Sequence, residues 1–143
     1  MKIVTCSGNS LNRMSEPVWI PKEVTVALHL RQVAEHGGDA GTRDESVLES
    51  ALARPPQRHA YDSSADLFAL AASYATGLAK KHPFIDGNKR TAFVVYRLFL
   101  LRNGFTVTAE KADRYLTMLH LASGEMDEDA FAAWLRENTA PIP

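Results

Sequence analysis

The sequence predicts an all-α fold, a single compact bundle of about six helices. Apolar residues recur every three or four positions through most of the chain, which is the spacing of one face of an α-helix. Proline, glycine and helix-capping residues separate these segments. With 143 residues, 45% of them hydrophobic, the chain can bury one substantial core but is too short for two domains.

The first two helices are each bounded by recognisable signals. Pro21 opens the first helix, and Gly37-Gly38 ends it. Its apolar face consists of Val26, Ala27, Leu30, Val33 and Ala34. Thr42 and Glu45 have the spacing of a capping box at the start of the second helix, which we expect to end at Pro55-Pro56. Its apolar face consists of Val47, Leu48, Ala51 and Leu52.

The third and fourth helices are predicted to lie at the centre of the bundle. We expect the third to open at Ser63 or Ser64 and the fourth at about Asn88. Both are apolar on nearly all sides, as central helices are. The evident polar residues of the fourth helix beyond its first turn are Tyr96, Arg97 and Arg102, before Gly104 ends it. A turn held between two buried helices is rigid, which suits catalytic groups.

The remaining segments complete the domain. A fifth helix is expected from Thr108 and a sixth from Asp127. The segment 54–63 has no helical pattern, and loops of this length are often functional. We expect residues 1–17 to be a loose polar extension, with Met14 as a possible natural start, residues 18–138 to be the folded domain, and residues 139–143 to be a short tail.

Charge and cysteine content exclude several classes of protein. A formal net charge of −1 gives no general attraction to nucleic acid or to anionic membranes. The single cysteine, Cys6, cannot form an intramolecular disulfide, which fits a reducing compartment. No apolar run has the length of a signal peptide core or a transmembrane helix. We therefore expect a soluble, cytoplasmic protein with no direct nucleic-acid or membrane binding.

The most informative stretch is His82–Thr91, which reads HPFIDGNKRT and directly precedes the fourth helix. Pro83 disfavours the helical conformation for the residue before it, so the histidine is predicted to project from a loop. Gly87 tolerates unusual backbone angles, and Asn88 is a favoured N-cap. The first backbone N–H groups of the helix, together with its dipole, then form a site for an anion such as phosphate.

Side chains of matching chemistry surround this anion site. Lys89 and Arg90 would neutralise a polyphosphate, the arginine through its planar fork. Asp86 offers a hard oxygen ligand for Mg²⁺ that also binds substrate phosphates. The imidazole of His82 can accept a proton from a hydroxyl at neutral pH. Phe84 has no polar group and is interpreted as the apolar anchor of the loop.

This stretch resembles the signature of the Fic/Doc superfamily, and specifically its death-on-curing (Doc) toxin branch. That branch has the pattern His-x-Phe-x-Asp/Asn-Gly/Ala-Asn-Lys-Arg, and every specified position is met. The Fic pattern has a glycine at the position of Lys89 and an arginine at that of Phe93. Residues 36–44 and 48–55 are similar to the segment that precedes the motif in Doc-like chains, and residues 122–125 to the turn before their last helix.

The resemblance implies a Doc-like toxin of a type II toxin-antitoxin system with the Fic/Doc fold, whose catalytic domain spans residues 18–138. Such a toxin transfers the γ-phosphoryl group of ATP to a Ser/Thr hydroxyl of a protein, here elongation factor Tu, and blocks translation. ATP would lie against Gly87, Asn88, Lys89 and Arg90, with Mg²⁺ on Asp86 and His82 as the base. An antitoxin would cover the cleft with its C-terminal segment.

Several alternatives remain open at this point. A Fic-type AMP transferase is one, although Lys89 would crowd its nucleotide and Phe93 offers no phosphate contact. A Doc-fold module that binds a partner without turnover is another. In Fic-like proteins the segment that corresponds to 54–63 is a flap that aligns the target by strand-like pairing, and Arg54 is a possible supporting residue. Arg43 and Glu49 either serve the site or brace the second helix.

Overall fold

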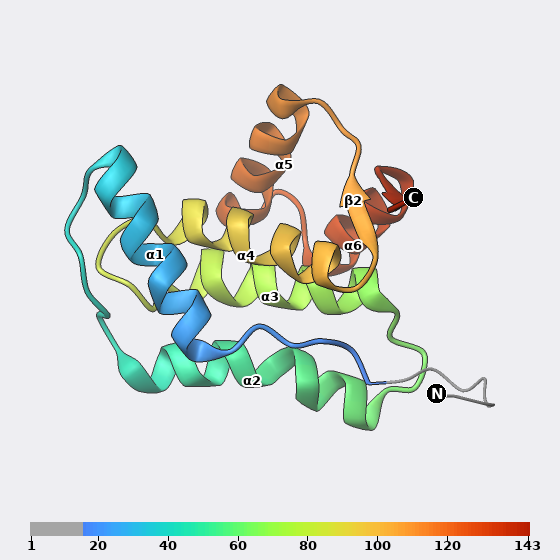
Figure 1. The fold of residues 1–143 in the computed structure, drawn as a ribbon, viewed down its shortest axis with the longest axis horizontal. Coiled ribbons are helices and arrows are strands. Elements are labelled where there is room, and N and C mark those ends of the chain that lie inside the picture. The colour runs from blue at the N-terminus through green and yellow to red at the C-terminus, as the bar shows by residue number, and fades with distance from the viewer. Residues whose placement is uncertain (1–15) are drawn as a thin grey trace.

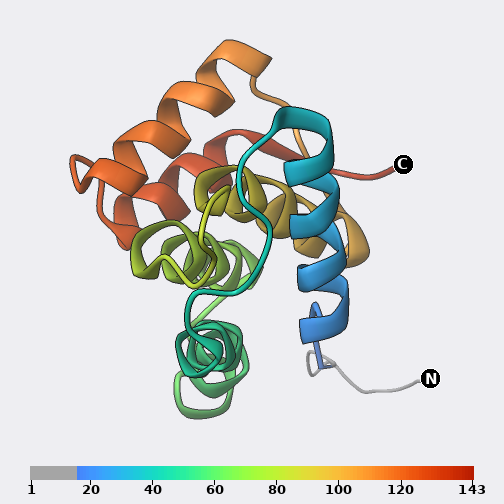
Figure 2. The same cartoon turned by 90° about the vertical axis from the view of Figure 1, so that its left-hand side faces the viewer.

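The computed structural model describes residues 16–143, which form a bundle of six α-helices (Figures 1 and 2). The helices are α1 Lys22–His36, α2 Glu45–Tyr61, α3 Leu67–Lys81, α4 Asn88–Arg102, α5 Lys111–Ser123 and α6 Glu128–Glu137. Two short strands, β2 Phe105–Val107 and β3 Thr139–Pro141, pair antiparallel. The predicted all-α fold is confirmed. No helix within the described range has both the length and the apolar character needed to cross a membrane.

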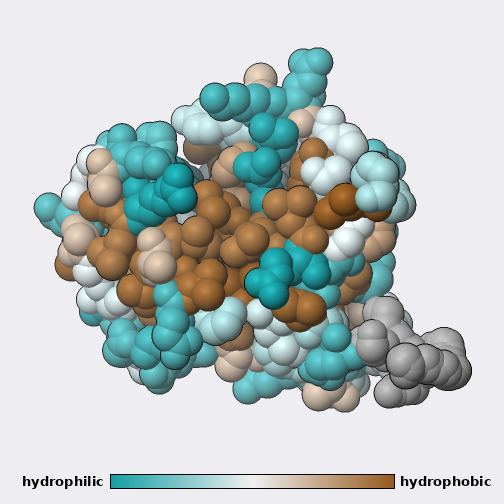
Figure 3. All heavy atoms as spheres, viewed as in Figure 1, coloured by the Kyte–Doolittle hydropathy of each residue, from teal (hydrophilic) through white to brown (hydrophobic). Residues whose placement is uncertain are grey.

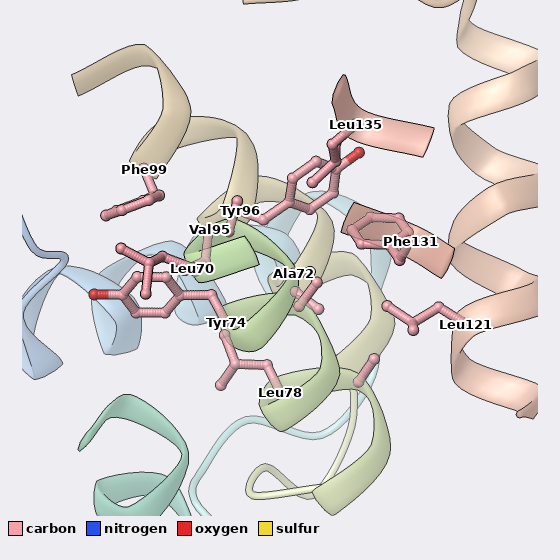
Figure 4. Packing of buried hydrophobic residues seen from close by; sticks show 14 of the residues in the cluster. Leu70, Ala72, Tyr74, Leu78, Val95, Tyr96, Phe99, Leu121, Phe131 and Leu135 are labelled. Carbon is pink, nitrogen blue, oxygen red and sulfur yellow. The ribbon is translucent and has the colours of Figure 1, made fainter. Parts of the chain in front are cut away.

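Helices α3 and α4 form the centre of the molecule, with α2 on one side, α5 and α6 on the other, and α1 crossing α4 (Figure 1). The core between them includes Leu70, Leu78, Val95 and Phe99 (Figure 4). Burying each such side chain contributes about 1.5–3 kcal/mol. At Gly77 a Cβ atom would lie 3.2 Å from that of Ala51, so the glycine lets α2 pack closely on α3. The loop between α3 and α4 is therefore carried by two firmly packed helices.

Aspartates begin three of the helices. The Asp44 carboxylate accepts the backbone N–H groups of Ser46 and Val47, at 3.0 and 3.2 Å, and caps α2. The predicted capping box of Thr42 and Glu45 is therefore wrong, because an aspartate directly before the helix takes this role. Asp66 and Asp127 cap α3 and α6 in the same way.

The start of α3 lies later than predicted. Ser64 does not open the helix but hydrogen-bonds to the Asp62 carboxylate, through its backbone N–H at 3.0 Å and its hydroxyl at 2.6 Å. These bonds form a turn, which competes locally with helix formation. The helix consequently begins at Leu67.

Helix α2 continues through Pro55-Pro56, so the predicted helix end is wrong. A proline inside a helix removes a hydrogen bond and costs about 3 kcal/mol. Tertiary contacts offset this cost, because Pro55 is buried and both Arg54 and Arg58 bind the carboxylate of Glu128 on α6. The predicted loop and flap at 54–63 are therefore wrong as well, since most of this segment is helical.

Three further differences concern the C-terminal half. Residues 105–107 pair with 139–141, so the predicted tail includes a strand, and α5 begins at Lys111 rather than Thr108. Strands of three residues are too short to give a detectable alternation in sequence. Tyr96, which was expected to be one of the polar residues of the fourth helix, is fully buried.

Cys6, Met14 and nearly all of the predicted extension 1–17 lie outside the described residues.

Candidate functional site

The loop that connects α3 to α4 begins with a strained residue. His82 has φ 53°, the one positive φ of a non-glycine residue within 16–143, and this left-handed conformation ends α3. Arg43 holds it in place: its Nε donates to the His82 carbonyl at 2.6 Å and its Nη2 to the Lys81 carbonyl at 3.0 Å. Arg43 thus serves the site, whereas Glu49 pairs with Lys22 at 3.0 Å and braces α1 against α2.

The segment before α2 pairs with this loop like a short strand. The backbone N–H of Arg43 donates to the Pro83 carbonyl at 2.8 Å, and that of Ile85 donates to the Gly41 carbonyl at 3.1 Å. Thr42 and Phe84 form an antiparallel bridge between these bonds. The strand-like pairing in this structure is therefore made within the chain by residues 41–44, not by the segment 54–63.

A buried histidine of α1 supports the middle of the loop. The ring of His29 stacks on that of Phe84, with centroids 3.8 Å apart and an angle of 6° between the planes. Its Nε2 donates a hydrogen bond of 2.7 Å to the carbonyl oxygen of Asp86. Both rings are 1% exposed. Phe84 is buried as its predicted anchoring role requires. His29 was missed by sequence reasoning, because the predicted apolar face of the first helix is wrong: Thr25 and His29 are its buried residues, whereas Leu30 is 48% exposed.

The amide of Asn88 closes the loop. Its Oδ1 accepts the backbone N–H of Phe84 at 2.9 Å, and its Nδ2 donates to the Phe84 carbonyl at 3.0 Å. The N-cap of α4 is Gly87, with φ 76°, so the predicted capping role of Asn88 is wrong. Because its side chain is occupied, Asn88 can bind phosphate only through its backbone N–H in the first turn.

Asp86 is held by the loop between α1 and α2. Its Oδ2 accepts the backbone N–H of Asp39 at 3.0 Å. Gly38, with φ 110°, lies so close that a Cβ atom there would be 3.2 Å from the Cβ of Asp86. The described residues contain no group of three or more metal-ligating side chains. A cation on Asp86 would accordingly take its remaining ligands from phosphates and water, which is the usual manner of Mg²⁺.

An open cavity of about 420 Å³ lies beside the loop, between the start of α4 and the end of α5. His82 and Lys89 line it from the motif, and Leu116, Leu119 and His120 line it from α5. Arg90 is exposed next to Lys89 in the first turn of α4. The structure thus places His82 and Asp86 on the loop directly before α4 and both cations in its first turn, with His82 and Lys89 lining one cavity.

Arg54 lies elsewhere. Its guanidinium donates to Glu128 at 2.9 Å and to the Ser73 carbonyl in the middle of α3 at 3.4 Å. The suggested support of the site by Arg54 is therefore corrected: it joins α2 to α6. His59 stacks edge-on against Trp19, with centroids 5.6 Å apart, and takes no part in the loop.

A helical bundle whose central hairpin carries HxFxDGNKR in its turn defines a class of protein. The chain belongs to the Fic/DOC family, to which residues 19–100 match. It is 39% identical over 119 residues to Protein kinase doc of Escherichia phage P1, covering 82% of this chain and 92% of that protein. It is 35% identical over 102 residues to Toxin Doc of Mycolicibacterium smegmatis, covering 69% and 78%. The predicted membership is confirmed.

Proposed function

We propose that this protein is a Doc-like toxin that transfers the γ-phosphoryl group of ATP to a serine or threonine hydroxyl of a protein. The observation that carries the proposal is the end of α4. There the exposed His82 and Asp86 lie on a loop whose backbone is held at several points, and the exposed Lys89 and Arg90 lie in the first turn of the helix that follows. The names of the two relatives, one a protein kinase and one a toxin, agree with it.

The chemistry follows from the charges. The first-turn N–H groups of α4, with Lys89 and Arg90, bind the triphosphate and stabilise the negative charge of the transition state. Mg²⁺ held by Asp86 would add a further positive charge on the phosphates when bound. His82 accepts the proton as the hydroxyl oxygen bonds to the γ-phosphorus and the bond from that phosphorus to the β–γ bridging oxygen breaks, so that ADP leaves.

The side chains around the motif favour phosphoryl transfer over AMP transfer. Lys89 lines the cavity beside His82, where a nucleotide bound for AMP transfer needs space. The ring of Phe93 carries the guanidinium of Arg97 at 5.0 Å and offers no group to phosphate. Both substitutions relative to the Fic pattern therefore remove features that would hold the α-phosphate for attack.

The proposed protein target is elongation factor Tu, and the proposed partner is an antitoxin that covers the cleft. A partner of this kind needs an exposed apolar surface. Apolar residues spread across the middle of one face (Figure 3). Large apolar side chains also remain exposed on α1, α4 and α5, namely Leu30, Leu101 and Leu116.

Label transfer tests the reaction. The protein is incubated with Mg²⁺, purified elongation factor Tu and ATP labelled at either the α or the γ phosphate. We expect label from the γ position alone, lost with His82→Ala and kept with His59→Ala, a histidine remote from the loop. Label from the α position would show AMP transfer instead. Without either label, the same test in a whole bacterial lysate separates a wrong target from an inert module.

A further inference from the structure

The cavity beside the motif has a wall that the proposed chemistry does not use. This wall is one face of α5, because Leu116, Leu119 and His120 recur at spacings of three and four and all line the cavity. The core side of the same helix carries Met118 and Leu121 instead. Helix α5 therefore has a second apolar face, and that face is open, since Leu116 is 49% exposed.

The lining of the cavity is apolar on one side and belongs to the motif on the other. Ala79 of α3 adds to the apolar part, and its small side chain leaves space above it. His82 and Lys89 contribute the motif side. The polar groups of α5 compensate each other, because the ring of His120 and the carboxylate of Glu125 lie 3.7 Å apart. The volume of about 420 Å³ falls within the range of about 300–1,000 Å³ that is typical of ligand pockets.

The geometry of phosphoryl transfer decides which reactant occupies this space. The attacking hydroxyl oxygen and the leaving oxygen of ADP lie roughly in line, on opposite sides of the γ-phosphorus. In the proposed mechanism His82 accepts the proton of the attacking hydroxyl, so the ADP part of the nucleotide points away from His82. The chain of the substrate protein, which carries that hydroxyl, then runs past His82. The cavity that His82 lines therefore adjoins the substrate protein rather than the nucleoside.

We propose that this cavity binds a large apolar side chain of the substrate protein, located within two positions of the hydroxyl that is phosphorylated. The inference rests on the proposed phosphoryl transfer and names the class of sequence that the site selects. Successive Cα atoms are about 3.8 Å apart, so a residue one or two positions away reaches a cavity that begins at the base. Covering Leu116 and Leu119 removes apolar surface from water, which favours an apolar occupant.

Steady-state label transfer tests the inference with Leu116→Gln, which makes the wall polar at similar volume. Its matched control is Tyr115→Gln, since Tyr115 is an exposed apolar residue of the same helix outside the cavity lining. The substrates are γ-labelled ATP and the protein that wild type labels. We expect Leu116→Gln to raise the KM for the substrate protein about ten-fold, with the KM for ATP as in wild type. Tyr115→Gln should match wild type in both.

The substrate protein provides the other half of the test. Mass spectrometry locates the labelled residue, and the large apolar residue within two positions of it is replaced by alanine. We expect this replacement to raise the KM for the substrate protein about ten-fold as well. Combined with Leu116→Gln it should give no further increase, because the two changes remove the same contact.

The outcomes separate this inference from the proposed function. A wild type that labels no protein would overturn the proposed function and this inference with it. When labelling occurs, three results overturn the inference alone. Leu116→Gln could raise the KM for ATP, which would make the cavity a nucleotide site. It could behave like Tyr115→Gln. Finally, the labelled residue could have no large apolar neighbour, or the two replacements could add independently.

Discussion

Two clusters of charge in this molecule are built in opposite ways. At the end of α4 the backbone is held by Arg43, Asn88 and His29, while Lys89 and Arg90 form no ion pair with any residue of the described chain. Between α2 and α6 the charged side chains form ion pairs with one another, since Arg54 and Arg58 both bind the carboxylate of Glu128. The first arrangement presents unpaired charge on a fixed frame, which suits a ligand, and the second joins two helices.

The largest expected contrast is between two arginines. In the proposed mechanism Arg90 stabilises the charge of the transition state, so we expect Arg90→Gln to lower phosphoryl transfer about 100- to 1000-fold with little change in stability. Arg58→Gln removes half of a partly buried pair, so we expect the free energy of unfolding to fall by about 1–2 kcal/mol with activity retained. Label transfer measures the activity of both variants, and urea denaturation measures their free energy of unfolding. Equal loss of activity in both variants would contradict the claim that the charges of α4 serve a ligand while those between α2 and α6 only join two helices.

The second effect concerns the hydrogen bonds that hold the backbone of the loop before α4. Asn88→Ala leaves the backbone N–H and carbonyl of Phe84, a buried residue, without partners, which costs about 2–3 kcal/mol. We expect both a lower midpoint in urea and a loss of label transfer. Full activity at normal stability would contradict the assigned role of the Asn88 amide.

A smaller effect is expected at His29. His29→Phe keeps a ring to stack on Phe84 but removes the hydrogen bond to the Asp86 carbonyl, which is worth about 1 kcal/mol or five-fold in rate. Label transfer at saturating ATP measures the rate, and His36→Phe, an exposed histidine of the same helix, is the matched control. Equal rates in the two variants would show that the bond does not position Asp86.

The smallest effect is a dependence on pH. Burial acts to raise the pKa of Asp66, but the hydrogen bonds from Arg136 and from the Ala69 N–H outweigh it and hold the pKa below its ordinary value. The unfolded chain therefore takes up this proton first, so the stability from Asp66 is complete above about pH 4 and is lost at lower pH. With the pair half exposed, we expect less than about 1 kcal/mol. Urea denaturation of wild type and Asp66→Asn at pH 7 and pH 3 should converge at the lower pH, and a constant difference would contradict this.

The parts of the site that lie together in the chain were predictable. The histidine, the glycine turn and the start of α4 follow from ten consecutive residues, because turn and cap chemistry acts locally. Arg43 and His29 contact the loop across 39 and 57 positions of sequence, so their roles depend on how α1 and α2 pack. No local rule reports such a contact.

The errors in the fold have the same origin. Two consecutive prolines usually end a helix, so Pro55-Pro56 predicted a helix end. Tertiary contacts of α2 with α3 and α6 outweighed this local preference, and the helix continues. The pairing of β2 with β3 joins segments more than thirty positions apart, with three residues in each strand. Local patterns thus predicted the six helices better than their ends, and they did not predict the two strands.

The most direct test of the central claim is the intact mass of elongation factor Tu after incubation with ATP, Mg²⁺ and the protein. A toxin that uses the unpaired charges of α4 for phosphoryl transfer adds the mass of one phosphoryl group. This addition should occur with wild type and with Arg58→Gln, and be absent with His82→Ala. Addition of an AMP group, or an unchanged phosphoryl addition with His82→Ala, would contradict the account.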